Sequence, residues 1–267
     1  MKSEVKKMQL AEINIEYLLT SAENKETILF VHGLGANLSQ FEKQHQYFQD
    51  RYKTLSISLR GHGNSSSSRE LTESDFELSR LADDIILLID SLGIDKFHFV
   101  GNSMGGNIGY ELMKTCPDRL LSFTSFGTTS VLKKSGFIIR LLKFTYKLMS
   151  MKTIAKLSGS AGVNESSKTK IVEMMSQAKK STVLNLIPYL GDFDYLEVIK
   201  HSQIKAQIIR GDKDKEINKV IESTIETFEQ RGDFSLIDLE NSGHFANLDN
   251  PDLFNITLET FLNSLNE

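Results

Sequence analysis

The feature that most constrains the fold of this chain is a strand, a sharp turn and a helix in direct succession. Residues 97–100 are β-prone, and they lead into Gly101-Asn-Ser103-Met-Gly105, a Gly-x-Ser-x-Gly turn. Residues 107–114 then have the composition of a helix. A serine in this context stands on an exposed corner at the positive end of the helix, and the two glycines admit the tight backbone. The pattern predicts that Ser103 is a nucleophile.

A nucleophilic serine needs a base and a group that orients the base. A second predicted strand ends in a turn that carries two carboxyl groups, Asp212 and Asp214. A third predicted strand, residues 234–239, leads to His244. In a parallel sheet the loops that follow the strands share the carboxyl edge. We therefore expect Ser103, one of the two aspartates and His244 to converge, although they are far apart in sequence.

Five motifs, taken in order, resemble the α/β-hydrolase fold family. They are His32-Gly33-Leu34-Gly35, Ser58-Leu-Arg60-Gly61-His62-Gly63-Asn-Ser65, Gly101-Asn-Ser103-Met-Gly105-Gly106, Gly211-Asp212-Lys213-Asp214 and Gly243-His244-Phe245. They are similar to the oxyanion loop, the Asp-x-x-Gly-x-Gly-x-Ser turn, the nucleophile elbow, the acid turn and the histidine loop of the family. Each motif is weak alone, but their joint order and spacing are typical of the family. The resemblance runs from about residue 27 to the C-terminus, apart from a middle insert.

The resemblance also implies which residues form the active site. It implies a catalytic triad and two oxyanion-binding backbone N–H groups: Ser103, Asp214 and His244, with the N–H groups of Leu34 and Met104. Asp214 is preferred to Asp212 because the acid of the family lies three residues after the glycine. The chain departs from the family at Ser58, where an aspartate that ties loops together is usual. It also lacks the usual proline after Asp214.

The alternation of predicted strands and helices indicates an α/β fold with a mostly parallel central sheet flanked by helices. We assign residues 1–130 and 200–267 to this α/β-hydrolase core. Between residues 131 and 199 the alternation stops and the sequence is typical of helices. This stretch fits the helical cap, or lid, that the family inserts over its active site.

Several single elements can also be predicted. We expect edge strands within residues 8–19, a short helix over 39–50, and strands over 54–59 and 121–126. An apolar stripe from Phe76 to Leu92 predicts a helix that ends at Gly93. Asp83 and Asp84 lie on this helix, and we assign them to its solvated side. Asn250 and Pro251 predict the N-cap and first residue of a C-terminal helix.

The first part of the predicted cap has an unusual charge distribution. Residues 131–160 contain seven basic residues and no acidic one, and apolar residues fill the helical positions between them. One interpretation is an apolar lid that accepts acyl chains, with residues 133–156 facing an anionic membrane surface. The other is a cap helix that covers the core and has a solvated charged face. We favour the second interpretation, because charged faces usually serve solubility.

Composition excludes several classes of protein. The net charge of −4 argues against nucleic acid as a partner, and no run of 18 apolar residues predicts a membrane span. Residues 1–7 lack the apolar core of a signal peptide. A single cysteine, Cys116, permits no internal disulfide and favours a cytoplasmic location. No spacing of histidines or cysteines indicates a metal, and no cofactor is expected. The oligomeric state stays open.

We therefore expect a serine hydrolase that cleaves carboxylic esters of small or medium acyl groups through an acyl-enzyme. The alternatives are a thioesterase, a lactonase or a carbon–carbon-bond hydrolase or lyase with the same triad, and a non-catalytic ligand-binding protein of this fold. Menaquinone-pathway synthases resemble the Ser-Met-Gly-Gly turn but carry Arg where this chain has Asn107, which counts against a lyase. His32 and His62 fit two roles, substrate contact or satisfaction of backbone groups in turns.

Overall fold

The computed structural model describes residues 4–20 and 25–265 of the 267-residue chain. Residues 1–3, where the N-terminal segment considered above begins, lie outside the described residues. The central sheet contains β1 (Val5–Leu10), β2 (Ile13–Leu19), β3 (Thr27–Val31), β4 (Lys53–Ser58), β5 (Ser66–Ser67), β6 (Phe97–Asn102), β7 (Leu120–Phe126), β10 (Ala206–Gly211) and β11 (Phe234–Leu239).

The order of the strands brings the predicted motifs to one edge of the sheet. The order is β1-β2-β4-β3-β6-β7-β10-β11, and β5 pairs with β2. The six neighbouring strands β4, β3, β6, β7, β10 and β11 run parallel. The β1–β2 hairpin is antiparallel, and β2 joins β4 in an antiparallel pair. The mostly parallel α/β sheet confirms the predicted fold class. Every residue of β3 and β6 is buried, as expected for parallel strands covered on both faces.

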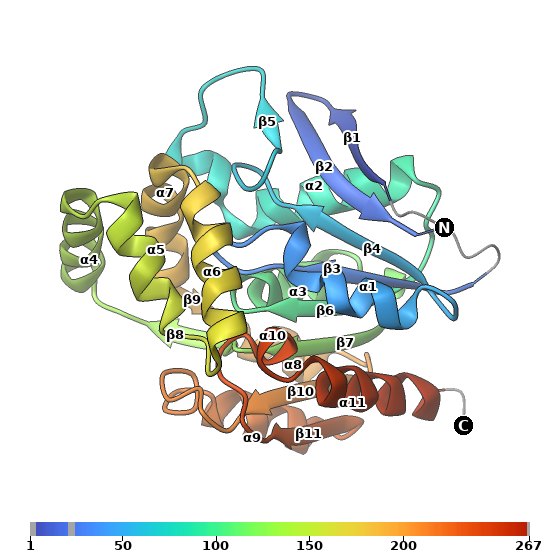
Figure 1. The fold of residues 1–267 in the computed structure, drawn as a ribbon. Helices are drawn as coiled ribbons and strands as arrows, with labels where there is room; N and C mark the ends of the chain where they lie inside the picture. Colours follow the sequence, from blue (N-terminus) through green and yellow to red (C-terminus); the bar gives the residue numbers. More distant parts are fainter. Residues whose placement is uncertain (1–3, 21–24, 266–267) are drawn as a thin grey trace.

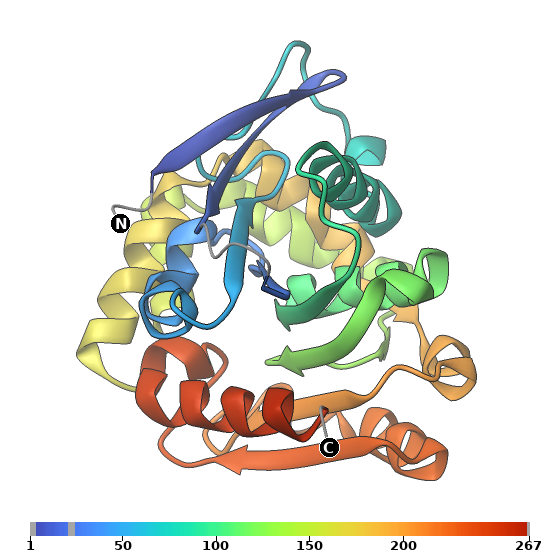
Figure 2. The ribbon, with the colours of Figure 1, turned by 90° about the vertical axis from the view of Figure 1, so that its right-hand side faces the viewer.

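Helices cover both faces of the sheet (Figures 1 and 2). The helices of this layer are α1 (Glu42–Phe48), α2 (Leu78–Ser91), α3 (Met104–Thr115), α8 (Leu196–His201), α9 (Glu222–Arg231), α10 (Ala246–Asp249) and α11 (Pro251–Ser264), with the 3-10 turns η1 (Leu38–Phe41), η2 (Glu73–Phe76) and η3 (Pro117–Arg119). One apolar cluster joins the sheet to α2, α3, α8 and α9, and a second joins its other face to α1 and α11.

The single elements predicted from the sequence are present, with one correction. The side chain of Asn250 accepts a hydrogen bond from the N–H of Leu253, so Asn250 caps α11 as predicted. Asp84, which we assigned to the solvated side of α2, is instead buried. Both of its carboxylate oxygens accept 2.8 Å hydrogen bonds from Arg60, which lies in the loop after β4. The pairing of two buried charges explains why an apparently polar position faces inward.

The segment between β7 and α8, where we predict the cap, lies at the carboxyl edge of the sheet (Figure 1). It consists of β8 (Val131–Lys133), α4 (Gly136–Leu148), α5 (Met151–Gly159), α6 (Glu165–Gln177), α7 (Lys180–Gly191) and β9 (Asp192–Asp194). The two short strands pair antiparallel where the chain leaves the core and returns to it, so the expectation of helices alone was incomplete. The division of the chain into core and cap at residues 131 and 199 stays a prediction.

The first cap helix does not cover the core as we expected. None of the residues of α4 is buried, whereas α5, α6 and α7 each bury several. Its apolar side chains include some of the most exposed in the described part of the chain. In residues 4–20 and 25–265, no helix combines the length and the apolar character needed to cross a membrane.

Candidate active site

Ser103 lies at the sharp turn between β6 and α3, where its backbone is strained. Its φ of 53° and ψ of −119° fall in a region that few residues other than glycine adopt. Its N–H donates to the carbonyl of Phe126 at 2.9 Å, which holds the turn against the end of β7. A Cβ on Gly105 would lie 2.2 Å from the carbonyl oxygen of Val31, so this position requires glycine. The turn sets the half-buried Ser103 at the N-terminus of α3.

His244 contacts Asp214 across the loops that follow β11 and β10. The distance between His244 Nδ1 and Asp214 Oδ2 is 2.9 Å. Asp214 is buried and His244 is half-buried. Burial by itself would raise the pKa of the Asp214 carboxyl group. The hydrogen bond and charge of His244, with backbone N–H groups including that of Ile217, lower this pKa by a larger amount. The net pKa therefore lies below its usual value, which keeps the carboxylate charged.

The other candidate acid, Asp212, faces a different partner. Its Oδ1 accepts a 3.0 Å hydrogen bond from the N–H of Ser242, and its Oδ2 pairs with Lys213 at 2.7 Å. Asp212 is exposed. The structure therefore brings Asp214 to His244 and leaves Asp212 to hold the backbone of the histidine loop.

Asn102, the residue before Ser103, connects the serine turn to the histidine loop. Its side-chain amide donates to the carbonyl of His244 at 2.9 Å and accepts from Gln40 Nε2 at 3.0 Å. Gln40 also donates to Asn247, which lies three residues after His244. All three amide residues are buried. This set was not predicted from the sequence, where its only signal is the position of Asn102 and Asn247 beside two of the motifs.

The predicted oxyanion loop packs directly against the serine. A Cβ on Gly33 would lie 3.1 Å from the Cβ of Ser103. Among the residues that the structure describes, neither the N–H of Leu34 nor that of Met104 has a hydrogen-bond acceptor. Met104 begins α3, and the first N–H groups of a helix have no partner within it. Both N–H groups are therefore available to bind a negatively charged oxygen.

Two cavities adjoin these residues and share one lining residue, Glu216. A cavity of about 260 Å³ is lined by Ser103, Met104, Asn107, Gly127, Thr128, Thr129, Leu132, Lys134, Leu190, Phe193, Glu216, Ile217, Lys219 and Val220. A second cavity of about 670 Å³ is lined by Ser160, Ala161, Gly162, Val163, Lys213, Asp214, Lys215, Glu216 and His244. Ser103 lines the first and His244 lines the second, while Glu216 lines both. The site therefore has room on either side of the serine and histidine.

The sequence profile described as "alpha/beta hydrolase fold" matches residues 26–251. The chain belongs to this family. It is 33% identical to 3-oxoadipate enol-lactonase 2 of Acinetobacter baylyi over 108 residues. These residues make up 40% of this chain and 39% of that relative. It is 22% identical to 3-oxoadipate enol-lactonase 1 of the same organism over 92% of both chains.

Solved structures share the whole fold. The enol-lactonase of Burkholderia xenovorans LB400 superimposes with a TM-score of 0.85 at 19% identity, covering 97% of this chain and all of that one. At this identity the likeness establishes the α/β-hydrolase fold and nothing finer. The chain covers about two fifths of the curated relative to which it is 33% identical.

This α/β hydrolase replaces the usual aspartate of the turn after β4 by a carboxylate from another strand. Ser58 Oγ donates to Oε2 of Glu16, on β2, at 2.7 Å. Glu16 also accepts bonds from the backbone N–H and the side-chain amide of Asn64, at 2.9 and 2.6 Å. Ser65 Oγ donates to the carbonyl of Ser58 and accepts from the N–H of Glu16. The buried Glu16 thus ties together the loop that the family aspartate would hold.

His32 and His62 satisfy groups within the protein. His32 Nε2 accepts the N–H of Leu59 at 3.0 Å, so the 2.7 Å contact between its Nδ1 and the carbonyl of Gly33 is an Nδ1–H donation by the neutral ring. Burial, and then the neighbouring His62, lower the pKa of His32 well below its usual value. Burial lowers the pKa of His62 to about 4. Of the two roles, the structure supports satisfaction of turns.

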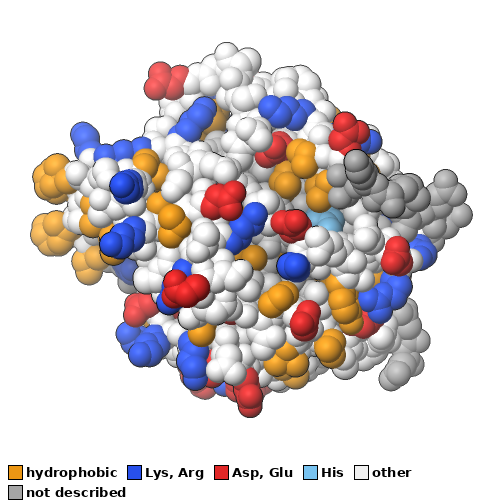
Figure 3. Space-filling view, in the orientation of Figure 1, with side chains coloured by type: hydrophobic (Ala, Val, Ile, Leu, Met, Phe, Trp, Pro, Cys, Tyr) orange, Lys and Arg blue, Asp and Glu red, His pale blue; other side chains and the backbone are white. Residues whose placement is uncertain are grey.

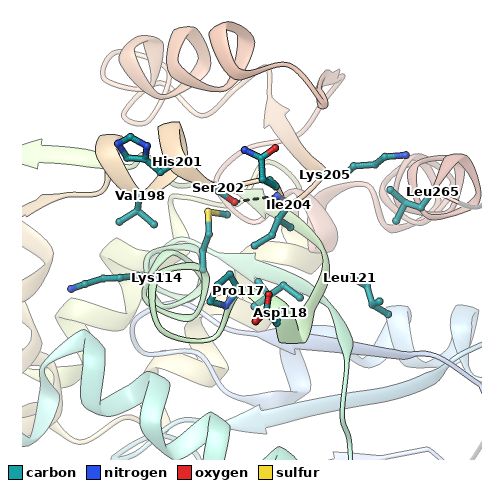
Figure 4. A pocket seen from close by; sticks show the side chains of 13 residues that line it. Lys114, Pro117, Asp118, Leu121, Val198, His201, Ser202, Ile204, Lys205 and Leu265 are labelled. Atoms are coloured by element: carbon teal, nitrogen blue, oxygen red, sulfur yellow. Dashed lines mark hydrogen bonds between the residues drawn. The ribbon is translucent and has the colours of Figure 1, made fainter.

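A hollow larger than these two cavities lies at the opposite edge of the sheet (Figure 4). It has a volume of about 760 Å³ and lies at the amino ends of β7 and β10, between Pro117, Leu121 and Lys205. Ligands of open parallel sheets bind at the carboxyl ends of the strands. We therefore place the candidate site at Ser103 and not in this hollow. In the described part of the chain, no group of three His, Cys, Asp or Glu side chains has the arrangement of a metal site.

Proposed function

We propose that the protein is a serine hydrolase that cleaves carboxylic esters of small or medium acyl groups through an acyl-enzyme. The observation that carries the proposal is the 2.9 Å contact between His244 and Asp214, in a loop that Asn102 joins to the strained turn at Ser103. A buried carboxylate at Nδ1 fixes the ring orientation and leaves Nε2 to act as a base. Ser103, Asp214 and His244 are the proposed triad.

In the first half of the reaction, Ser103 Oγ attacks the acyl carbonyl carbon while His244 Nε2 takes the hydroxyl proton. The carbonyl oxygen becomes negatively charged, and the N–H groups of Leu34 and Met104 stabilise it. The tetrahedral intermediate then collapses, the bond to the alcohol oxygen breaks, and His244 returns the proton to the leaving alcohol.

In the second half, the acyl group on Ser103 is released by water. His244 takes a proton from the water, whose oxygen attacks the acyl carbon. When the second tetrahedral intermediate collapses, the proton returns to Ser103 Oγ and the carboxylic acid leaves. The steps balance without a metal or cofactor.

The cavity at Ser103 supports an acyl group of limited size. Its volume of about 260 Å³ is just below the range of about 300–1,000 Å³ that is usual for small-molecule sites. The cap and the acid loop supply the apolar side chains of Leu132, Leu190, Phe193 and Val220. Burial of an acyl chain against these side chains is favourable in proportion to the apolar area removed from water.

A lactone is the second candidate substrate. Two curated relatives and one solved structure with the same fold carry the name enol-lactonase. A lactone is a cyclic ester, so the same proton transfers apply, and the leaving alcohol stays attached to the acyl group until water releases the product. The proposed Ser103 mechanism covers both substrates.

The decisive experiment combines a fluorophosphonate probe with a substrate panel. We expect the wild-type protein to be labelled at Ser103 and to hydrolyse p-nitrophenyl esters with about two to eight acyl carbons. Lactones, acyl thioesters and β-diketones in the same panel distinguish the lactonase, thioesterase and carbon–carbon-bond alternatives. A protein that is correctly folded but neither labelled nor active on any of these substrates would be a non-catalytic binder, and the proposal would fail.

We also propose that the protein acts in the cytoplasm. The proposal is supported by Cys116, the single cysteine of the chain, which is half-buried at the end of α3. Burial raises the pKa of its thiol, which disfavours the reactive thiolate. Cell fractionation tests the location, and recovery of the protein in the secreted fraction would contradict it.

A further inference from the structure

The outward face of α4 carries a continuous apolar stripe. The stripe consists of side chains whose exposed fractions are large: Phe137 (76%), Ile138 (49%), Leu141 (53%), Phe144 (58%) and Leu148 (72%). Phe137, Leu141, Phe144 and Leu148 follow the spacing of four, three and four residues that aligns side chains along one side of a helix. Figure 3 shows hydrophobic side chains at the edge of the molecule where Figure 1 draws α4. The stripe therefore faces solvent along the whole helix.

The opposite side of α4 already has a partner within the cap. Ile139, Leu142 and Tyr146 are half-buried, and α4 packs against α7. A Cβ on Gly191 would come within 2.8 Å of Ile139, which shows how closely the two helices approach. The exposed stripe is thus a second apolar face and not the packing face of the helix. Large exposed apolar patches mark interaction sites.

Basic side chains border the stripe. Arg140 lies one helical turn from both Phe137 and Phe144, and Lys147 lies one turn from Phe144. In the described part of the chain neither basic residue forms an ion pair. Lys143, further round the helix, pairs with Glu73 of the core. Residues 131–160 contain seven basic residues and no acidic one, although the whole chain has a net charge of −4. Of these seven, Lys133 pairs with Asp194 and Lys143 with Glu73, so the partner of this face must tolerate the positive charges of Arg140 and Lys147.

We propose that α4 docks the cap on an anionic lipid surface, with the apolar stripe at the acyl boundary and the basic residues at the headgroups. Helices that lie in a membrane interface combine an apolar face with lysines and arginines beside it. The 13 residues of α4 span only about 20 Å, which suits a helix that lies on a bilayer and does not cross it. This inference goes beyond the proposed ester hydrolysis and does not depend on it.

The charge pattern disfavours the other occupants of the face. A two-fold contact between copies of this chain would bring the same basic residues of both copies together, and like charges repel. A partner helix normally binds in a groove, whereas α4 forms the convex outer edge of the cap (Figure 1). An anionic bilayer offers a flat apolar boundary and many negative headgroups at once.

The proposed surface lies next to the candidate active site in the chain. β8 leads directly into α4, and Leu132 and Lys134 line the cavity at Ser103. Contact of α4 with lipid would therefore hold the wall of that cavity near the membrane surface. An ester dissolved in the bilayer would then be close to the site.

Co-sedimentation with vesicles tests the proposal on the full chain. We expect binding to vesicles of phosphatidylcholine and phosphatidylglycerol, weaker binding to phosphatidylcholine alone, and loss of binding as salt shortens the Debye length from about 10 Å at 0.1 M. Arg140→Gln/Lys147→Gln should weaken partitioning about fivefold per residue. Phe137→Ser/Phe144→Ser should weaken it by about tenfold or more, through lost apolar burial.

Matched variants away from the cap serve as controls. Leu87→Ser removes an exposed apolar side chain from α2, and Lys6→Gln/Lys7→Gln removes two exposed charges from β1. These variants should bind like the wild type, and all variants should keep the wild-type thermal midpoint, because the altered side chains are exposed. Three results would each overturn the proposal: no wild-type binding to anionic vesicles, equal losses in cap and control variants, or a dimer that Phe137→Ser/Phe144→Ser dissociates.

Discussion

Glu16 on β2 accepts a 2.7 Å hydrogen bond from Ser58 at the end of β4, so that two strands together supply what one aspartate usually provides. Both residues are buried, and Asn64 completes the set from the following loop. This loop contains His62, which packs edge-on against His32 in the loop before Leu34. Glu16 therefore helps to fix the loop whose His62 packs against the predicted oxyanion loop.

Removal of the Glu16 carboxylate should destabilise the protein strongly. Glu16→Ala leaves the buried hydroxyl of Ser58 without its acceptor and removes the acceptor of the exposed Asn64 amide, and we expect a loss of about 1–3 kcal/mol in the free energy of unfolding. Urea denaturation measures the loss. A value within about 0.5 kcal/mol of the wild type, which is usual for surface changes, would contradict the structural role.

An aspartate at position 58 should be tolerated only without Glu16. Ser58→Asp alone places two carboxyl groups within hydrogen-bond distance, and their repulsion should destabilise the fold. In Glu16→Gln/Ser58→Asp one negative charge remains, so the double variant should be more stable than the sum of the single effects predicts. Strict additivity in urea denaturation would show that the two positions do not share one charge site.

Ser103→Ala should abolish turnover while leaving the fold intact. Loss of the attacking oxygen removes the covalent route, and single triad losses typically cost about 10⁴- to 10⁶-fold in rate. Steady-state hydrolysis of a p-nitrophenyl ester and probe labelling provide the two readouts. Ser160→Ala, at the wall of the larger cavity, is the control and should retain labelling. Hydrolysis near the wild-type rate by Ser103→Ala would rule out the proposed nucleophile.

Asp214→Asn should reduce kcat far more than Asp212→Asn. The amide at position 214 favours the wrong tautomer of His244, and a loss of about 10⁴-fold is expected. Asp212 contacts the N–H of Ser242 and not the imidazole, so its amide variant should lose less than about tenfold. Measurement of kcat for both variants decides the assignment. The reverse ranking would show that the acid is Asp212.

Medium acyl chains should be preferred to acetate. Each methylene moved from water into the apolar cavity at Ser103 adds about 0.8 kcal/mol, or roughly fourfold in kcat/KM, until the cavity is full. Leu190→Phe places a larger side chain in the cavity and should shift the optimum to shorter acyl chains. A chain-length series of p-nitrophenyl esters measures both effects. A wild-type preference for acetate would reject the acyl role of this cavity.

Acid should destabilise the protein through His45. Burial lowers the pKa of this ring to about 4 from 6.5, and its two nitrogens contact Thr54 and Ser56. Between these values the unfolded chain binds the proton and the folded protein does not. The contribution of His45 to the free energy of unfolding is therefore fully present above pH 6.5. It is lost as the pH falls towards 4, by about 1.4 kcal/mol per pH unit.

The slope of stability against pH tests this assignment. His45→Gln should reduce the slope between pH 4 and 6.5 by about 1.4 kcal/mol per unit, while slopes from other buried histidines remain. Urea denaturation at a series of pH values provides the slope. His201→Gln, at an exposed position on α8, is the control. An unchanged slope in His45→Gln would mean that this ring does not cause the acid sensitivity.

The sequence by itself was sufficient for the features that depend on local backbone. The turn at Ser103 was predictable because its tight geometry requires glycine nearby, and the start of α11 because Asn250 and Pro251 favour a helix N-terminus. The parallel sheet was predictable because alternating strands and helices permit few other arrangements. The convergence of three loops at one edge follows from that topology.

Only the tertiary structure decided which groups meet. Asp212 and Asp214 lie in one turn, and the direction of each side chain depends on the loop packed against it. Glu16 stands 42 residues before Ser58, and no local pattern relates them. The periodicity of α4 shows that it has apolar positions, but a helix can have two apolar faces. Which face packs on α7 and which stays in solvent depends on the neighbouring helices, and these are fixed only when the whole chain folds.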